Sequence, residues 1–197
     1  MLAYKIVLNI LRPIMYFFYR LKITGRENIP DDAVVVCGNH TSNLDAIFVC
    51  IAFDGGKPLS FMAKQELFSI PLLSALLRSI NAIPVNRGAT EISTLRNAIS
   101  TLKAGDKVMV FPEGHRVSAD EESEGAKTGA AMIACRAKVD MLPVYISVKK
   151  RIFKRTNVII GKPISTQDAA GEGSAKYRAV VDSVFSEIMR LGQGGEL

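Results

Sequence analysis

Short apolar runs alternate with helical stretches along this chain after residue 25. The runs are rich in β-branched residues and are continuous, which is typical of strands covered on both faces. The alternation predicts an α/β fold, a single domain with a mostly parallel central sheet flanked by helices. We assign this domain to residues 25–191, followed by a flexible tail at 192–197. Strands are expected at 33–37, 59–63, 82–85, 108–111, 142–148 and 158–160, and helices at 44–52, 67–79, 91–103, 129–137 and 175–191.

The composition argues against disorder and points to an anionic partner. Of the 197 residues, 48% are hydrophobic and 22% are charged, which is enough apolar material for a core. Lys and Arg exceed Asp and Glu by 25 to 19, a net charge of +6. Such a balance suits nucleic acid, an acidic membrane surface or a phosphorylated small molecule. The three cysteines show no Cys-x-x-Cys spacing and are expected to be free thiols.

Residues 1–24 predict an amphipathic helical segment with a narrow polar stripe. Its other face is apolar, as in helices that lie in the membrane interface. Charges interrupt the run that a spanning helix needs, and Pro13 is expected to kink or split the helix near Arg12. A core helix that packs its apolar face on the domain is the alternative and stays open here. The stripe consists of Lys5, Asn9, Arg12, Tyr16 and Arg20.

The first candidate for chemistry is residues 39–45, which follow the strand at 33–37. His40 and Asp45 can meet only if His40 lies in the turn and Asp45 in the first turn of the next helix. A carboxylate that holds one imidazole nitrogen leaves the other to take a proton from a hydroxyl. Because no Gly-x-Ser-x-Gly elbow is present, the pattern favours direct general-base catalysis without a covalent intermediate. Ser42-x-x-Asp45 is also the pattern of a helix capping box, and both interpretations stay open.

A second candidate group follows the strand at 108–111. In an open parallel sheet, ligands bind beyond the carboxyl ends of the strands. Arg116 can pair bidentately with a phosphate. Glu113 can accept a hydrogen bond from a substrate hydroxyl or fix the arginine, and Gly114 lets the backbone approach a ligand. An ordinary strand-end turn with a solvated Glu–Arg pair is the alternative.

Two further cations occupy positions suited to an anion. Arg87 follows the strand at 82–85, and Lys127 precedes the helix at 129–137, where backbone amides also favour negative charge. A solvated arginine and a capped helix start explain these two positions equally well. No ligand spacing typical of zinc is present, so we expect no metal site.

Taken in order, these segments resemble the 1-acylglycerol-3-phosphate acyltransferase (lysophosphatidic acid acyltransferase) family of glycerolipid acyltransferases. The resemblance covers roughly residues 25–150. The sequence departs from the family at His115, where threonine is usual. The four matching blocks are the His-x4-Asp block at 39–45, a second block at 64–87, the Phe-Pro-Glu-Gly block at 111–116, and Lys127-x-Gly129 with Leu142-Pro143-Val144.

The resemblance implies transfer of an acyl group from acyl-CoA or acyl carrier protein to the free hydroxyl of 1-acylglycerol-3-phosphate. The product would be phosphatidic acid for phospholipid synthesis, and no cofactor is implied beyond the acyl donor. His40 would act as general base and Asp45 as its partner, with backbone amides near Gly114 as one candidate for the oxyanion donors. The implied location is the cytoplasmic face of the membrane, with a peripheral or monotopic attachment through the N-terminal helix. The implied substrate-binding residues are Lys64, Arg87, Glu113, Gly114, Arg116 and Lys127.

Two other functions stay open at this stage. His115 puts the acceptor in question, so a different lysolipid is the first alternative. A basic nucleic-acid-binding domain is the non-enzymatic alternative, but charge alone suggests it and no recognition motif supports it, so we expect no nucleic-acid partner. The basic run at 149–155 suits lipid headgroups, an acidic carrier protein or a solvated edge of the sheet.

Overall fold

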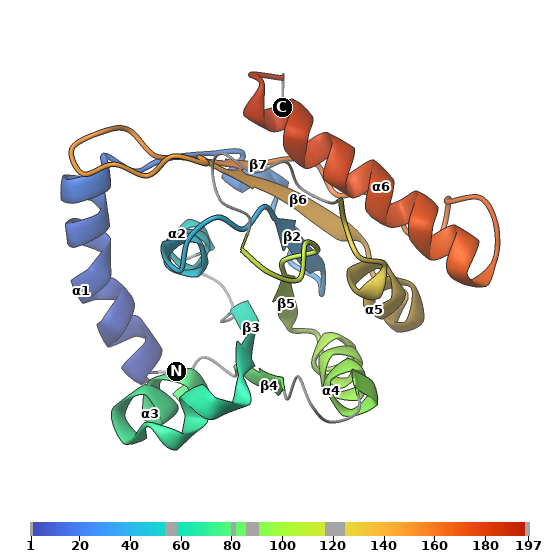
Figure 1. The fold of residues 1–197 in the computed structure, drawn as a ribbon, viewed down its shortest axis with the longest axis horizontal. Helices are drawn as coiled ribbons and strands as arrows, with labels where there is room; N and C mark the ends of the chain where they lie inside the picture. Colours follow the sequence, from blue (N-terminus) through green and yellow to red (C-terminus); the bar gives the residue numbers. More distant parts are fainter. Residues whose placement is uncertain (1, 54–58, 80–81, 86–90, 117–124, 196–197) are drawn as a thin grey trace.

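The computed structural model describes residues 2–53, 59–79, 82–85, 91–116 and 125–195, and these form one α/β unit (Figure 1). Within these ranges, the strands build a seven-stranded sheet in the order β1-β7-β6-β2-β5-β3-β4. All neighbouring strands are parallel except β6 and β7. The expected mostly parallel sheet is therefore confirmed. The strands are β1 (Lys22–Thr24), β2 (Val35–Gly38), β3 (Leu59–Lys64), β4 (Ile83–Val85), β5 (Lys107–Val110), β6 (Met141–Ile146) and β7 (Asn157–Ile160).

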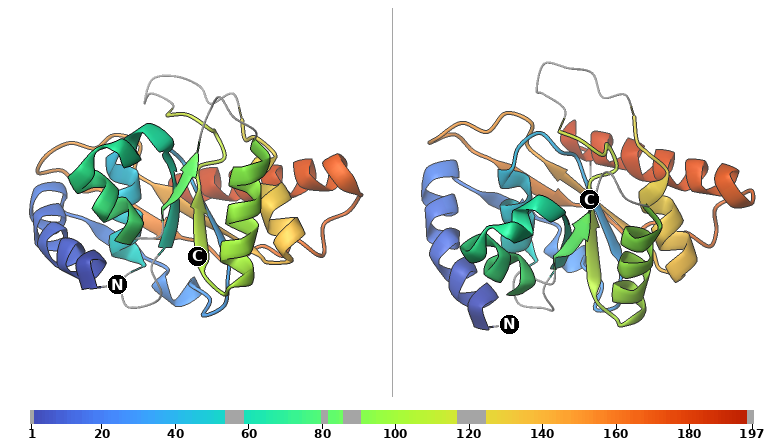
Figure 2. Two further views of the ribbon diagram at one scale, coloured as in Figure 1. Left: turned by 90° about the horizontal axis from the view of Figure 1, so that it is seen from below. Right: turned by 60° about the horizontal axis from the view of Figure 1, so that its bottom comes forward.

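Helices cover both faces of the sheet (Figures 1 and 2). On one face lie α1 (Leu2–Tyr19) and α2 (Leu44–Ala52). On the other lie α4 (Glu91–Lys103), α5 (Gly129–Ala137) and α6 (Gly173–Gly192). The short α3 (Pro71–Ser79) contacts α1. None of these described helices combines the length and the apolar character that crossing a bilayer requires.

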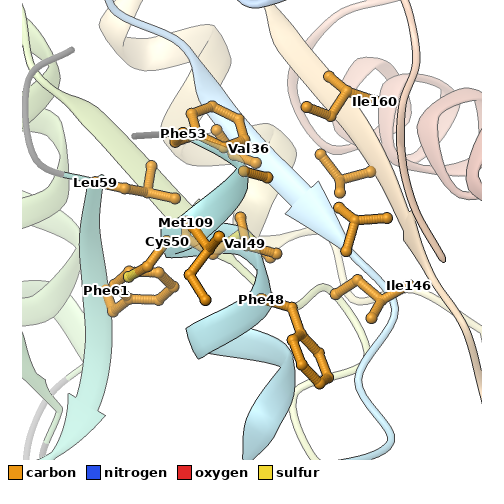
Figure 3. Packing of buried hydrophobic residues seen from close by; sticks show 14 of the residues in the cluster. Val36, Phe48, Val49, Cys50, Phe53, Leu59, Phe61, Met109, Ile146 and Ile160 are labelled. Atoms are coloured by element: carbon orange, nitrogen blue, oxygen red, sulfur yellow. The ribbon is translucent and has the colours of Figure 1, made fainter. Parts of the chain in front are cut away.

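Side chains of the central strands are buried alternately on the two faces. Val34 and Val36 pack toward α2, whereas Val35 and Cys37 pack toward the helices of the opposite face. Figure 3 shows the first of these layers, in which Phe48 and Val49 of α2 lie against residues of β2, β5 and β6. Burial on both faces explains why the strands read as continuous apolar runs. Cys37, Cys50 and Cys135 are free thiols, as expected.

Several boundaries differ from the sequence-based expectation. The expected helix at 67–79 is two elements, a 3-10 helix at Gln65–Ser69 and then α3, because proline disfavours a helical residue before it but suits a first helical position. Pro13 does not split α1, which runs unbroken to Tyr19. The helical part of the expected segment 1–24 ends at Tyr19, because Lys22–Thr24 forms strand β1 and pairs with β7 at the sheet edge.

The carboxyl ends of β6, β2 and β5 lie side by side in the middle of the sheet. Cys37 of β2 is in register with Val110 of β5, and Gly38 is in register with Val144 of β6. The loops that follow these three strands therefore meet at one edge. In open parallel sheets this is the edge where ligands bind.

Candidate active site

His40 and Asp45 form a hydrogen-bonded pair at this edge. His40 lies in the turn after β2, Asp45 lies in the first turn of α2, and His40 Nδ1 is 3.1 Å from Asp45 Oδ2. The His40 side chain is 18% exposed, whereas Asp45 is completely buried. An ionised carboxylate only accepts hydrogen bonds, so Nδ1 carries the proton and Nε2 has the lone pair. The geometry is that of a general base held by a carboxylate.

The same carboxylate also fixes the start of α2. Asp45 Oδ2 accepts hydrogen bonds from the backbone N–H groups of Thr41 (2.8 Å) and Ser42 (2.7 Å). The helix begins one residue later than a Ser42 cap implies, with Asn43 at the N-cap position. Asp45 Oδ2 therefore anchors both the histidine ring and the backbone of the turn, and the catalytic interpretation of the pattern stays a prediction.

Lys150, in the loop after β6, occupies the other side of Asp45. Its Nζ lies 2.6 Å from Asp45 Oδ1, and its side chain is only 5% exposed. Burial raises the pKa of Asp45. The hydrogen bond from His40, the charge and hydrogen bond of Lys150, and the Ser42 amide outweigh that effect and hold the pKa below its ordinary value. Asp45 is thus ionised at neutral pH although it lies in the interior.

Asn39 joins the ends of β2 and β6. Its side chain is 2% exposed. The side-chain Nδ2 donates to the carbonyl of Ile146 (2.8 Å), and Oδ1 accepts from the N–H of Ile146 (2.8 Å). Two such bonds fix the position of the residue before His40 and continue the strand pairing by one step.

The loop after β5 supports His40 from another side. The rings of His40 and Phe111 are stacked, with centroids 3.9 Å apart and an interplanar angle of 14°. Glu113 is 3% exposed, and its Oε2 accepts a hydrogen bond from the backbone N–H of His40 (3.0 Å). Burial raises the pKa of Glu113, and that hydrogen bond and the nearby histidines oppose the rise. Here Glu113 serves the histidine loop, and its contact with substrate stays a prediction.

Comparison with known proteins identifies the family. The sequence model described as Acyltransferase matches residues 20–147. A 1-acyl-sn-glycerol-3-phosphate acyltransferase of Bacillus subtilis (strain 168) is 32% identical over 193 residues, which cover 95% of each chain. One from Streptococcus pneumoniae is 29% identical over 85% of this chain and 64% of that protein. The crystal structure of the 1-acyl-sn-glycerophosphate (LPA) acyltransferase PlsC from Thermotoga maritima matches with a TM-score of 0.71 at 30% identity, covering 94% of this chain and 81% of that one.

This chain belongs to the 1-acylglycerol-3-phosphate acyltransferase family. The resemblance inferred from the four sequence blocks is thus confirmed, and the protein is an acyltransferase. The His40–Asp45 geometry fits that assignment, because acyl transfer to a hydroxyl requires removal of its proton.

Two predicted substrate-binding residues of this acyltransferase lie next to each other. Gly114 has a positive φ of 76°, which favours glycine. A Cβ atom there would come within 3.1 Å of the Lys127 side chain. The Lys127 N–H donates to the carbonyl of Pro112 (2.8 Å), so the lysine is held beside the loop. The Gly114 N–H donates to the carbonyl of Phe111 (3.0 Å), which makes this particular amide unsuitable as the expected oxyanion donor.

The other predicted cations are less closely defined. Arg116 is exposed in the same loop. Lys64 is the last residue of β3 and lies in register with Val85 of β4, so its backbone ends at the same sheet edge. Arg87 lies outside the described residues. Substrate binding by these three residues stays a prediction.

Sequence reasoning missed the roles of Asn39, Phe111 and Lys150. Asn39 and Phe111 belong to the blocks that resemble the family, and this was the only sign that they matter. Nothing in the local sequence indicates that Asn39 bonds to Ile146 of β6 or that the Phe111 ring stacks on His40. Lys150 is one of five cations in the run 149–155, and no local signal separates it from its neighbours. Its partner Thr41 is 109 positions away in the chain.

Proposed function

We propose that this acyltransferase transfers a fatty acyl group from an acyl thioester to the free hydroxyl of 1-acylglycerol-3-phosphate, forming phosphatidic acid. The observation that carries the proposal is the His40–Asp45 pair, with His40 Nδ1 held at 3.1 Å and the ring partly exposed. The names of the relatives and the basic residues around the site support this acceptor.

The proposed reaction is a direct displacement. Nε2 of His40 takes the proton of the acceptor hydroxyl, and the oxygen attacks the carbonyl carbon of the thioester. The tetrahedral intermediate collapses with cleavage of the carbon–sulfur bond. The thiolate then takes the proton back from His40, so the free thiol and the new ester are the products. Asp45 keeps the imidazole in the correct tautomer and stabilises the imidazolium between these steps.

The phosphate of the acceptor needs positive charge beside the dyad. A phosphomonoester carries about −1.5 to −2 charges at neutral pH. Arg116 lies in the loop that carries Glu113, and Lys127 lies beside Gly114 of that loop. We propose that they bind this group together with Lys64 and Arg87. Arginine is suited to bidentate phosphate binding.

We also propose that α1 lies in the membrane interface on the cytoplasmic side. Its apolar residues divide between two faces: Tyr4, Leu8 and Met15 are buried against the domain. Others are exposed, and the Phe17 and Phe18 rings lie within 6.0 Å of Phe153 in the loop after β6. Large exposed apolar patches mark interaction sites, and a lipid surface fits an acyltransferase with acyl-chain substrates. The exposed set is Ile6, Ile10, Ile14, Tyr16, Phe17, Phe18, Ile152 and Phe153.

A different lysolipid acceptor is the second candidate. The observation that favours it is His115, an exposed residue at the threonine position of the third block. His115 is also the second of the two histidines and hence the rival general base, and Asp120, five residues further on, lies outside the described residues. A panel of acceptors with and without a phosphomonoester distinguishes the two acceptor classes.

The experiment is thiol release by the full-length protein in mixed micelles, with acyl-CoA and acyl carrier protein as separate donors. We expect turnover with 1-acylglycerol-3-phosphate and formation of phosphatidic acid, abolished in His40→Ala. His115→Ala should retain more than a tenth of the wild-type rate of thiol release, because within the described residues no carboxylate is hydrogen-bonded to the His115 ring as Asp45 is to that of His40. Equal turnover by wild type and His40→Ala would refute the general base, and turnover only with another lysolipid would refute the acceptor.

A further inference from the structure

The structure adds to the dyad a lysine that no sequence block contains. We infer that Lys150 is a positioning residue: its ammonium holds the Asp45 carboxylate in place toward His40 and favours the unprotonated imidazole. This role rests on the proposed function, whereas the charge contact behind the dyad can be tested without turnover.

The contacts of Asp45 divide its two oxygens between two tasks. Oδ2 accepts from His40 Nδ1 and from two backbone amides of the turn. Oδ1 faces Lys150 Nζ at 2.6 Å. Lys150 also donates to Oγ1 of Thr41, whose hydroxyl in turn donates to the carbonyl of Val148 (3.2 Å). Lys150 is therefore fixed to both the carboxylate and the turn that carries the histidine.

The loop that carries Lys150 is itself anchored to α1. The Phe153 N–H donates to the carbonyl of Phe18 (2.6 Å), and the Thr156 N–H donates to the carbonyl of Tyr19 (2.9 Å). Figure 1 shows this loop, in orange, reaching the end of α1. The anchoring places Lys150 inside while the rest of the basic run stays outside. Arg151, Lys154 and Arg155 are exposed, whereas the Lys150 side chain is 5% exposed.

A buried lysine in this position has a specific chemical consequence. Among the described residues, the ionisable groups that face the dyad are Glu113 from the loop after β5, which His115 influences, and Lys150 from the loop after β6. A buried carboxylate without a counter-charge would pull a proton onto the His40–Asp45 pair. The ammonium offsets this attraction, so the Asp45 carboxylate stays ionised and continues to hold the His40 imidazole by its Nδ1 proton. Lys150 touches neither reacting group, and it acts through Asp45.

The test measures imidazole titration by NMR in the detergent-solubilised full-length protein. The chain has two histidines, so His115 serves as the internal reference, assigned with His115→Gln. Lys150→Met and Lys150→Gln should raise the titration midpoint of His40 by about one pH unit, the size expected for loss of one close charge. Lys103→Met removes an exposed lysine at the end of α4 and should leave it unchanged.

Kinetics provide the second readout. In both neutral variants, the acidic limb of kcat/KM should move to higher pH, with kcat reduced about 10–100-fold and KM little changed. Lys150→Arg, which keeps the charge, should restore the position of the limb. A matching shift by both methods supports the role of Lys150.

Several outcomes overturn this role. An unmoved His40 midpoint in either folded neutral variant excludes the charge contact as the relevant effect. A raised KM with unchanged kcat and an unchanged limb makes Lys150 a substrate-binding residue instead. If neither Lys150→Met nor Lys150→Gln folds, the contact between Lys150 and Asp45 is a structural ion pair and the positioning role is rejected. If the wild type turns over no acceptor, the proposed function fails, and the NMR shift still decides whether Lys150 controls the dyad.

Discussion

Asp45 in the first turn of α2 is completely buried, whereas Phe17 near the end of α1 keeps 67% of its surface exposed. A charged side chain is ordinarily exposed and a large apolar one is ordinarily buried, so both residues are exceptions. The buried carboxylate is supplied with partners by the chain itself: His40, Lys150 and two amides. The exposed ring lies beside the aromatic rings of Phe18 and Phe153. We propose that the buried carboxylate serves the chemistry of the site and that the exposed ring serves contact with a surface outside the domain.

Helix α6 shows what an ordinary surface helix of this protein looks like. It buries a continuous apolar stripe and exposes its ion pairs, such as Arg178 with Asp182 and Arg190 with Glu187. Helix α1 instead exposes isoleucine and phenylalanine side chains beside its polar residues. α1 thus has one apolar face for the domain and a second that the domain does not cover.

The largest effect is expected from His40→Ala, which removes the base and leaves its surroundings in place. We expect kcat/KM to fall by about 10³- to 10⁴-fold, the contribution of a positioned general base, while the thermal midpoint changes little because the side chain is partly exposed. Thiol release and circular dichroism measure the two quantities. A fall of less than tenfold in folded protein contradicts the assignment.

The next effect concerns stability at Asp45. Asp45→Ala leaves Lys150 buried without its counter-charge and two amides without an acceptor. We expect a loss of about 3–5 kcal/mol of unfolding free energy, measured by urea denaturation in detergent. The matched surface change on α6, Glu187→Ala, breaks a partly exposed pair and should cost at most about 1 kcal/mol. Equal losses at the two sites would show that burial does not distinguish them.

A third prediction concerns the exposed apolar face of α1. Ile10→Ser with Phe17→Ser should weaken binding to anionic vesicles by about 3 kcal/mol, roughly 100-fold in partition coefficient, because two apolar side chains no longer enter the interface. The thermal midpoint should hardly change, since both residues are exposed. Val184→Ser on α6 is the opposite control: it should lower the midpoint and leave vesicle binding intact. Co-sedimentation with wild-type affinity would refute the interfacial helix.

The smallest effect is a change in the pH dependence of stability. The pKa of Asp45 is lowered in the folded protein, so its ionisation contributes stability above its unfolded pKa of about 4, and this is lost as pH falls through the folded pKa. The pKa of Glu113 is raised by burial. Its ionisation therefore reduces stability as pH rises from the unfolded value of about 4.3 through the folded one.

Two neutral variants separate these opposite slopes. Asp45→Asn should flatten the loss of stability in acid, and Glu113→Gln, which keeps an acceptor for the His40 amide, should flatten the loss toward neutral pH. Urea unfolding between pH 3 and 7 measures both. Parallel stability curves for Glu113→Gln and wild type would contradict the raised pKa of Glu113.

Local patterns were sufficient for most elements of the fold. The helices at 44–52, 91–103 and 129–137 have the expected bounds, because apolar periodicity and helix boundaries depend on residues a few positions apart. The His40–Asp45 pair also lies within one turn and the helix start that follows it. The expected split at Pro13 failed because α1 packs against α2 and α3 along its length, and tertiary contacts override a local preference.

The sequence by itself determined the α/β architecture, the helix that starts beside His40, and the order of the blocks that places the chain in its family. Only the tertiary structure decided that Lys150 stands behind Asp45, that Asn39 clamps Ile146, that Glu113 holds the His40 backbone, and that Lys22–Thr24 joins the sheet. The physical reason is the distance along the chain over which each effect acts. Propensity and periodicity act over a few residues, whereas these contacts arise from strand register, which brings together side chains about a hundred positions apart.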